Sequence, residues 1–174
     1  MFKHIPASDN TVWQATAKQW KSDTMAYGDE GVFIVQDIER QLDAAKNETG
    51  KDINYYFLVK KEETVASSLL ETSYAMAKSS KPWLKLLHIT LRPSLLANLD
   101  GLKEAFLVLS YSITHSIDLI FNEHPSKELK IYGRTVEMLN LFQAIVSAGK
   151  LDSVLGKYKL DARIVGKWLI LAKK

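Results

Sequence analysis

Histidine is the side chain best suited to proton transfer near neutral pH, and the chain holds His4, His88, His115 and His124. Their spacing matches none of the patterns that bring two imidazoles onto one metal ion. His115 and Asp118 lie three residues apart in a predicted helix, and we interpret them as a solvated polar face. Cysteine is absent, which excludes a disulfide framework, a thiolate zinc site and a cysteine nucleophile. The sequence also has no Gly-x-Ser-x-Gly elbow and no Walker loop.

The charge balance argues against a polyanionic partner. The 174 residues include 23 Lys and Arg and 20 Asp and Glu, giving a formal net charge of +3. Nucleic-acid and membrane binding usually need a concentrated basic patch, so we expect neither partner. We interpret the basic residues near the C-terminus as a solvated chain end.

The chain carries no clear targeting segment. Residues 1–6 lack the charged-then-apolar pattern of a signal peptide, so we expect a cytoplasmic protein. The most apolar stretch, residues 105–121, contains a histidine, an aspartate and several serines, and it is short for a bilayer span. It therefore predicts a buried amphipathic helix.

Three consecutive β-type segments lie between residues 55 and 92. Residues 55–59 are rich in aromatic and β-branched side chains and predict a strand. Residues 64–74 follow a polar turn as its hairpin partner. Residues 83–91 show a period of two with mostly apolar side chains on both faces, which is typical of a strand covered on both sides.

The remaining pattern predicts helices and strands around these segments. Ser8 or Asp9 can cap a first helix, and Gly28 breaks the pattern before a second. The four tryptophans, Trp13, Trp20, Trp83 and Trp168, are predicted to lie in the core rather than on a stacking platform. No repeat, low-complexity segment or linker is present, so we expect one domain over residues 1–174. A further helix is predicted at residues 102–121, with a buried stripe that includes Phe106, Ile113, Ile117 and Ile120. Another is predicted at residues 136–146, with Val136 among the residues that point inward. Further strands are predicted at residues 2–5, 129–132, 155–160 and 164–171.

The resulting order, β-α-α-β-β-β-α-β-α-β-β, resembles the GNAT superfamily of N-acetyltransferases along essentially the whole chain. The resemblance implies an α/β (α+β) fold with a central mixed, mostly antiparallel sheet flanked by helices. The segments similar to the family are residues 4–9 (opening strand and capped helix), 57–59 with 65–71 (central hairpin), 87–93 (fourth strand ending before proline), and 129–132 with 136–149 (fifth strand and fourth helix).

The resemblance implies acetyl-CoA as a cofactor, with its pyrophosphate held by backbone N–H groups at a helix N-terminus. The family's loop carries the pattern Gln/Arg-x-x-Gly-x-Gly/Ala between the fourth strand and the third helix. Here residues 92–102 contain a single glycine, and leucines stand where small residues would be needed. Alternatively, Asp100 is simply the N-cap of the long helix. The candidate cofactor-binding residues are Leu91, Arg92, Ser94, Asn98, Gly101 and Lys103.

The resemblance also implies a base that deprotonates an amine and an acid that protonates the leaving thiolate. His88, on the strand where the family often places its base, is the candidate base; the alternative is a structural strand histidine. Many family members place a catalytic tyrosine four residues before the glycine that ends the fourth helix, and here that position is Ile145. Tyr132 is therefore the candidate acid, although Tyr132 and Tyr158 are alternatively half-buried strand residues with hydroxyls at the rim.

Three functions follow from this reading. The first is an acyl-CoA-dependent N-acyltransferase with a degenerate cofactor loop and an amine substrate. The second is a GNAT-like domain that has lost the chemistry and binds a protein partner. Its closing pattern over residues 144–171 is similar to some internal virion proteins of bacteriophages, which would place it in a virion or host cytoplasm. The third is an unrelated α/β interaction domain.

Overall fold

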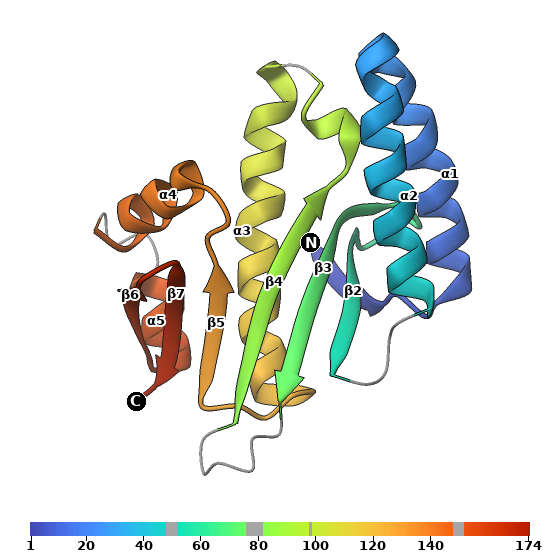
Figure 1. Cartoon of the computed structure of the whole chain (residues 1–174). Helices are drawn as coiled ribbons and strands as arrows, with labels where there is room; N and C mark the ends of the chain where they lie inside the picture. Colours follow the sequence, from blue (N-terminus) through green and yellow to red (C-terminus); the bar gives the residue numbers. More distant parts are fainter. Residues whose placement is uncertain (48–51, 76–81, 98, 148–151) are drawn as a thin grey trace. The chain divides into compact units, whose positions relative to one another are not determined.

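The computed structural model describes residues 1–47, 52–75, 82–97, 99–147 and 152–174 (Figure 1). The predicted order of strands and helices is confirmed, with the helix α5 and two short 3-10 segments, η1 and η2, in addition. The elements are β1 (Phe2–Pro6), α1 (Asn10–Thr24), η1 (Met25–Glu30), α2 (Gly31–Asn47), β2 (Ile53–Lys60), β3 (Ala66–Ala75), β4 (Trp83–Leu91), η2 (Pro93–Leu95), α3 (Leu99–Asn122), β5 (Glu128–Tyr132), α4 (Val136–Ser147), α5 (Asp152–Tyr158), β6 (Leu160–Val165) and β7 (Trp168–Lys173).

The seven strands form one mixed sheet in the order β1-β2-β3-β4-β5-β7-β6. β1 pairs antiparallel with β2, and β7 pairs antiparallel with both β5 and β6. β4 and β5 are parallel neighbours, and the long helix α3 supplies the crossover that a parallel connection requires. The expected α/β class with a central mixed sheet flanked by helices is therefore confirmed.

The chain packs into two compact units. Unit 1 comprises Met1–Glu71 and Ile89–His115, and unit 2 comprises Thr72–His88 and Ser116–Lys174. The elements β3, β4 and α3 contribute residues to both units. The expectation of one domain over residues 1–174 stays a prediction.

The start of α1 in unit 1 follows directly from the sequence. Asp9 is its N-cap, with Oδ1 accepting hydrogen bonds of 3.0 Å from the backbone amides of both Thr11 and Val12. A side-chain oxygen in this position satisfies amides that the helix leaves unpaired. Gly28 has φ 57 and lies in the kink of η1, a conformation that costs a glycine little.

The core of unit 1 lies between the helix pair α1–α2 and strands β2 and β3. Trp20 is fully buried there, and its indole Nε1 donates to the Ala66 carbonyl at 2.8 Å. Thr16 Oγ1 accepts from the Ala66 amide at 3.0 Å, so a buried polar edge of β3 is paired with α1. The apolar members of this cluster include Val12, Ile38, Leu42, Ala45, Tyr55, Phe57, Val59 and Leu69.

The bounds of one predicted strand in unit 2 are wrong. Residues 155–160 were expected to be extended, but α5 runs to Tyr158 and β6 begins only at Leu160. Lys159 has a left-handed φ of 52, which ends the helix and turns the chain into the strand. A short apolar run does not by itself distinguish a helix from a strand.

Several side chains expected in the core are only half-buried or are exposed. Trp20 is fully buried, whereas Trp13, Trp83 and Trp168 are only half-buried. Phe106 of α3 and Val136 of α4, both predicted to point inward, are 52% and 67% exposed. In β4 only Leu84 and Leu86 are buried, so the expectation of a strand covered on both faces is wrong. Apart from α5, periodicity identified the helices and strands, but it did not show which of their faces other elements cover.

The helix α3 is apolar enough to be compared with a membrane span. Its window Lys103–Asn122 has a mean hydropathy of 1.2, and 44% of that window is buried inside the protein. Ile113, Ile117 and Ile120 are among its buried residues, as the sequence predicted. These isoleucines show that one side of α3 packs inside the protein.

Candidate functional site

The pairing of β4 with β5 ends before β4 does. The two strands are in register from Trp83↔Glu128 to Leu86↔Ile131, whereas β4 continues to Leu91. The candidate base His88 lies two residues beyond the last pair on β4, and the candidate acid Tyr132 follows that pair directly on β5. This stretch is where the predicted cofactor site would begin.

Arg92, which follows β4, is held by α1. Its guanidinium donates to both carboxylate oxygens of Asp23, with Nε–Oδ2 at 2.6 Å and Nη2–Oδ1 at 3.3 Å. The side chain of Asp23 is only 7% exposed. Burial opposes ionisation of Asp23, but hydrogen bonds from Arg92, Gln19 and Ser94 outweigh it, so the pKa of this carboxyl lies below its ordinary value. Two candidate phosphate ligands, Arg92 and Ser94, therefore both bind a carboxylate of the protein itself.

The next residue along the chain is fixed as well. Tyr27 in η1 donates its hydroxyl to the Pro93 carbonyl at 2.7 Å. Burial, with the negative charge of Asp23, raises the pKa of Tyr27, so this hydroxyl keeps its proton and remains a donor. The Arg92 amide in turn donates to the Ser67 carbonyl of β3 at 2.9 Å. The start of the loop is thus bonded to three other elements of unit 1.

The end of the same loop packs against the start of α3. A Cβ added to Gly101 would lie 2.5 Å from the Leu95 carbonyl oxygen and 2.9 Å from its carbonyl carbon. Leu95 itself is buried, at 7% exposure. Glycine is required at position 101 because the η2 backbone occupies the space that a side chain would need. α3 begins at Leu99, so the alternative of Asp100 as its N-cap is wrong, and Asp100 lies in the first turn instead.

The residues present do not fit the pyrophosphate of acetyl-CoA. A phosphate at a helix N-terminus needs free amides and close backbone approach. Here the Leu95 carbonyl oxygen, with its partial negative charge, lies against the first turn of α3. The nearby cation, Arg92, is already paired with the Asp23 carboxylate. Of the remaining candidates, Leu91 is half-buried on β4 and Lys103 is exposed on α3, while Asn98 lies outside the described residues.

The two candidate catalytic residues belong to unit 2, whereas the loop residues from Leu91 to Lys103 belong to unit 1. His88 is half-buried on β4. Tyr132 is half-buried at the end of β5, and its ring packs against Trp168 with centroids 4.8 Å apart. Roles for both residues stay predictions.

The other histidines are parts of packed contacts. His4 and His115 bring their Nδ1 atoms within 3.4 Å, and burial lowers the pKa of His124, which packs on Tyr74. Asp118 accepts a 2.5 Å hydrogen bond from Tyr158, so the predicted solvated face of His115 and Asp118 is wrong. Within the described ranges no three His, Asp or Glu side chains gather as metal ligands.

Tyr158 lies on α5 and not on a strand. Its hydrogen bond to Asp118, with burial in second place, raises the pKa of the Tyr158 hydroxyl. The Tyr158 hydroxyl therefore keeps its proton and donates a hydrogen bond to Asp118, which helps α5 to pack on α3.

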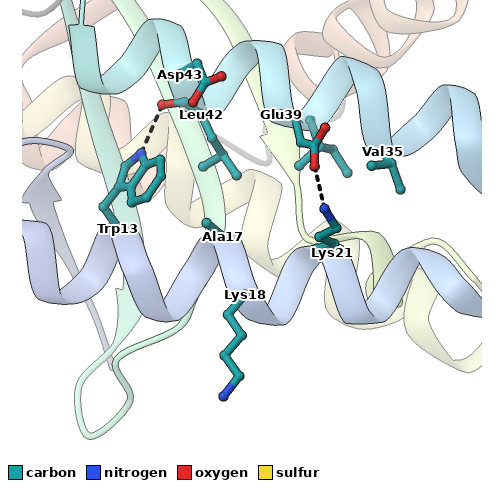
Figure 2. Close-up of a pocket in the computed structure, with 9 residues that line it drawn as sticks. Trp13, Ala17, Lys18, Lys21, Val35, Glu39, Leu42 and Asp43 are labelled. Carbon is teal, nitrogen blue, oxygen red and sulfur yellow. Dashed lines mark hydrogen bonds and ion pairs between the residues drawn. The ribbon is translucent and has the colours of Figure 1, made fainter.

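A cavity of about 340 Å³ lies elsewhere in unit 1, between α1 and α2 (Figure 2). Trp13 closes one end, with its indole Nε1 bonded to the Leu42 carbonyl at 3.0 Å. Lys21 and Glu39, which form an ion pair at 2.9 Å, also line it, while Lys18 points away from the cavity (Figure 2). None of the predicted site residues lines it.

The residues that the sequence did not single out are Asp23 and Tyr27. Each is a common polar residue near a helix end, and each contacts a partner 69 or 66 positions away in the sequence. The one signal in the sequence was the departure of residues 92–102 from the family pattern, because it weakened the case for cofactor binding by this loop.

Comparison with known proteins gives a likeness of fold. No protein-family model and no curated protein sequence matches the chain. It is similar to a chain in the crystal structure of the KacTA–DNA complex, with 10% identity, a TM-score of 0.49, and coverage of 98% of this chain and 91% of that one. It is also similar to a putative GNAT-family acetyltransferase from Desulfovibrio desulfuricans, with 11% identity, a TM-score of 0.38, and coverage of 98% and 96%. At these identities and TM-scores the likenesses carry no inference about activity, substrate or partner.

Proposed function

We propose that this chain uses an acetyltransferase-like fold to bind a partner protein and does not transfer acyl groups from acyl-CoA. The observation that carries this proposal is the contact of the Leu95 carbonyl with Gly101, 2.5 Å from the position of a Cβ. The paired Arg92 and Asp23 support it, because they withdraw the nearest guanidinium from any phosphate.

A second candidate function, N-acyl transfer, has one observation in its favour. The register of β4 and β5 stops at Leu86↔Ile131, and the candidate base His88 and acid Tyr132 follow within two residues. Such an enzyme would need residues 92–101 to adopt a different arrangement, with the Arg92–Asp23 pair broken.

A thermal-shift titration with acetyl-CoA separates the two functions. A ligand at 100 times its dissociation constant stabilises the folded state by about 2.7 kcal/mol. We expect no saturable rise in the melting temperature of the full chain. ADP serves as the control, because it carries the same pyrophosphate chemistry without the acyl-pantetheine arm.

A saturable rise with acetyl-CoA that exceeds the rise with ADP would contradict the binding proposal. The variants His88→Ala and Tyr132→Phe would then be assayed for acetylation of amines. Loss of activity in both variants, with acetyl-CoA binding retained, would establish the acyltransferase in its place.

A further inference from the structure

The part of the sheet in unit 2 has two unlike faces. On one face the leucines and isoleucines of β4, β5 and β7 are buried. α3 and α5 lie on that side, because Lys173 of β7 donates to the Ile120 carbonyl at 3.0 Å and Tyr158 of α5 donates to Asp118. Both helices lie behind the strands in Figure 1. The buried residues are Leu84, Leu86, Leu129, Ile131, Leu169 and Leu171.

The opposite face carries aromatic and cationic side chains that are half-buried or exposed. We call it the open face and define it by Trp83, Lys85, Lys130, Tyr132, Arg163 and Trp168. Figure 1 shows β5 and β7 turned toward the viewer, with no helix of unit 2 drawn in front of them. Sequence reasoning had assigned both tryptophans of this face to the core.

The cations of the open face rest on its aromatic rings. Lys85 Nζ lies 4.2 Å from the ring centroid of Trp83 and 5.3 Å from that of Trp168. Lys130 Nζ lies 5.6 Å from the Trp83 centroid. Such contacts hold an ammonium group in place on an apolar surface, so these charges are positioned before any partner binds.

The face carries surplus positive charge. Glu128 pairs with Arg163 at 2.8 Å and with Lys130 at 3.4 Å. Lys85 has no carboxylate partner among the described residues. Asp161, two residues before Arg163 on β6, pairs with Lys174 at 3.3 Å. Four cations and two carboxylates therefore leave two positive charges. A half-buried cation that lacks a counter-ion is a natural site for a carboxylate from another molecule.

The strand register arranges these cations in a line. Lys85 is opposite Lys130, Lys130 is opposite Ile170, and Ile170 is opposite Arg163. Three strand spacings separate the ends of this line, a span of about 14 Å. An extended peptide places its first and fifth residues about 13 Å apart on one side. Acidic residues at alternate positions of an extended segment therefore match the line.

We propose that the open face docks an extended acidic segment of a partner protein. Its carboxylates bind Lys85, Lys130 and Arg163, and its apolar side chains pack on Tyr132 and Trp168. Tryptophan, tyrosine and arginine are the residues that most often dominate protein–protein binding energy. This inference deepens the proposed binding function. Binding of acetyl-CoA and binding of the acidic probe are measured in separate titrations, so the two proposals can fail separately.

The same observations disfavour single-stranded nucleic acid. Bases stack on free aromatic faces, whereas the Trp83 ring already carries the ammonium of Lys85. Glu128, in contact with two of the three cations, would also repel a phosphate backbone. Oligothymidylate binding is therefore the contrary outcome of the test.

The probe is a random copolymer of glutamate and tyrosine, titrated into the full chain while tryptophan emission is followed. We expect a saturable change in emission that weakens as salt is raised. Lys85→Gln should weaken binding about tenfold, the loss of one charge-assisted contact. Lys18→Gln on α1, which removes the same charge from an exposed site in unit 1, should leave binding unchanged. Arg163→Gln is a second test and should also weaken binding. The Arg163 side chain is 56% exposed, so this substitution should not impair folding.

The tryptophans report where the probe binds. Trp168→Phe should remove most of the emission change, whereas Trp13→Phe in unit 1 should retain it. The proposal is overturned if no saturable change occurs, if Lys85→Gln and Lys18→Gln bind alike, or if oligothymidylate binds more tightly than the copolymer.

Discussion

The loop over residues 92–101 and the open face each carry a cationic side chain, and the two cations differ in whether a carboxylate of the protein neutralises them. In the loop, Arg92 forms an ion pair with the buried carboxylate of Asp23, and the backbone of η2 packs against the start of α3. On the open face, Lys85 rests between two aromatic rings with no carboxylate partner among the described residues. Charge that is neutralised inside the protein maintains structure, whereas positioned charge without a counter-ion is available for recognition. The difference teaches that the predicted cofactor loop and the best binding surface are built from different residues.

The largest expected loss of stability comes from a substitution on the buried face of β4. Leu84→Ala removes a fully buried side chain and should lower the free energy of unfolding by about 2–5 kcal/mol, the usual loss for such a cavity. Urea denaturation followed by circular dichroism measures it. A loss below about 1 kcal/mol would mean that the buried face is not packed as described.

The closure of the loop is tested at Gly101. A Cβ there meets the Leu95 backbone, which cannot rotate away, so Gly101→Ala should destabilise the protein by about 1–3 kcal/mol. Gly156→Ala is the matched control, because nothing lies within 4 Å of its Cβ position in α5, and alanine should stabilise that helix by up to about 1 kcal/mol. If both variants gained stability, the contact between η2 and α3 would be wrong.

The ion pair of the loop is tested by pH. Asp23→Asn should cost about 1–2 kcal/mol at neutral pH, since it removes a charge-assisted bond to Arg92. Because the folded pKa of Asp23 is lowered, its contribution is present above the unfolded pKa, near 3.8, and is lost as pH falls through the folded value. Unfolding free energies measured from neutral to strongly acidic pH should therefore converge for the two proteins at low pH. Curves that stay parallel would contradict the lowered pKa.

The smallest expected effect on stability is at the open face. Lys85→Gln should lower the free energy of unfolding by about 0.5–1 kcal/mol, the usual loss for a cation–π contact that is not fully buried. The same urea titration used for Leu84→Ala, one residue away, measures it. A cost comparable to that of Leu84→Ala would show that Lys85 is structural, and the contrast between loop and open face would then fail.

What could be predicted from the sequence was local. Asp9 was expected to cap α1, and it does, because a cap involves residues two and three positions away. The three β-type segments, the long helix and the order of elements followed from periodicity, which is also short-range. The α5 segment was missed because its apolar run is too short for its period to be decisive.

What failed depended on distant partners. The pairing of Arg92 with Asp23 joins residues 69 positions apart, and nothing near either residue announces it. The exposure of Phe106 and the half-burial of Trp83 depend on which face a neighbouring element covers, and hydrophobic patterning does not record that. The predicted cofactor residues therefore rested on the resemblance alone. In the structure two of them, Arg92 and Ser94, form hydrogen bonds with Asp23.

The bonds from Asp23 to Arg92 and from Tyr27 to Pro93 also bear on how fast the protein unfolds. Each closes a loop of 69 or 66 residues, and closing a flexible loop of that length costs about 4 kcal/mol beyond a fixed term. We therefore expect both bonds to form late, after the folding transition state, so that breaking either one speeds unfolding more than it slows folding. Stopped-flow measurements should therefore show a larger change in the unfolding rate than in the folding rate when either bond is removed, because both bonds lengthen the lifetime of the native state.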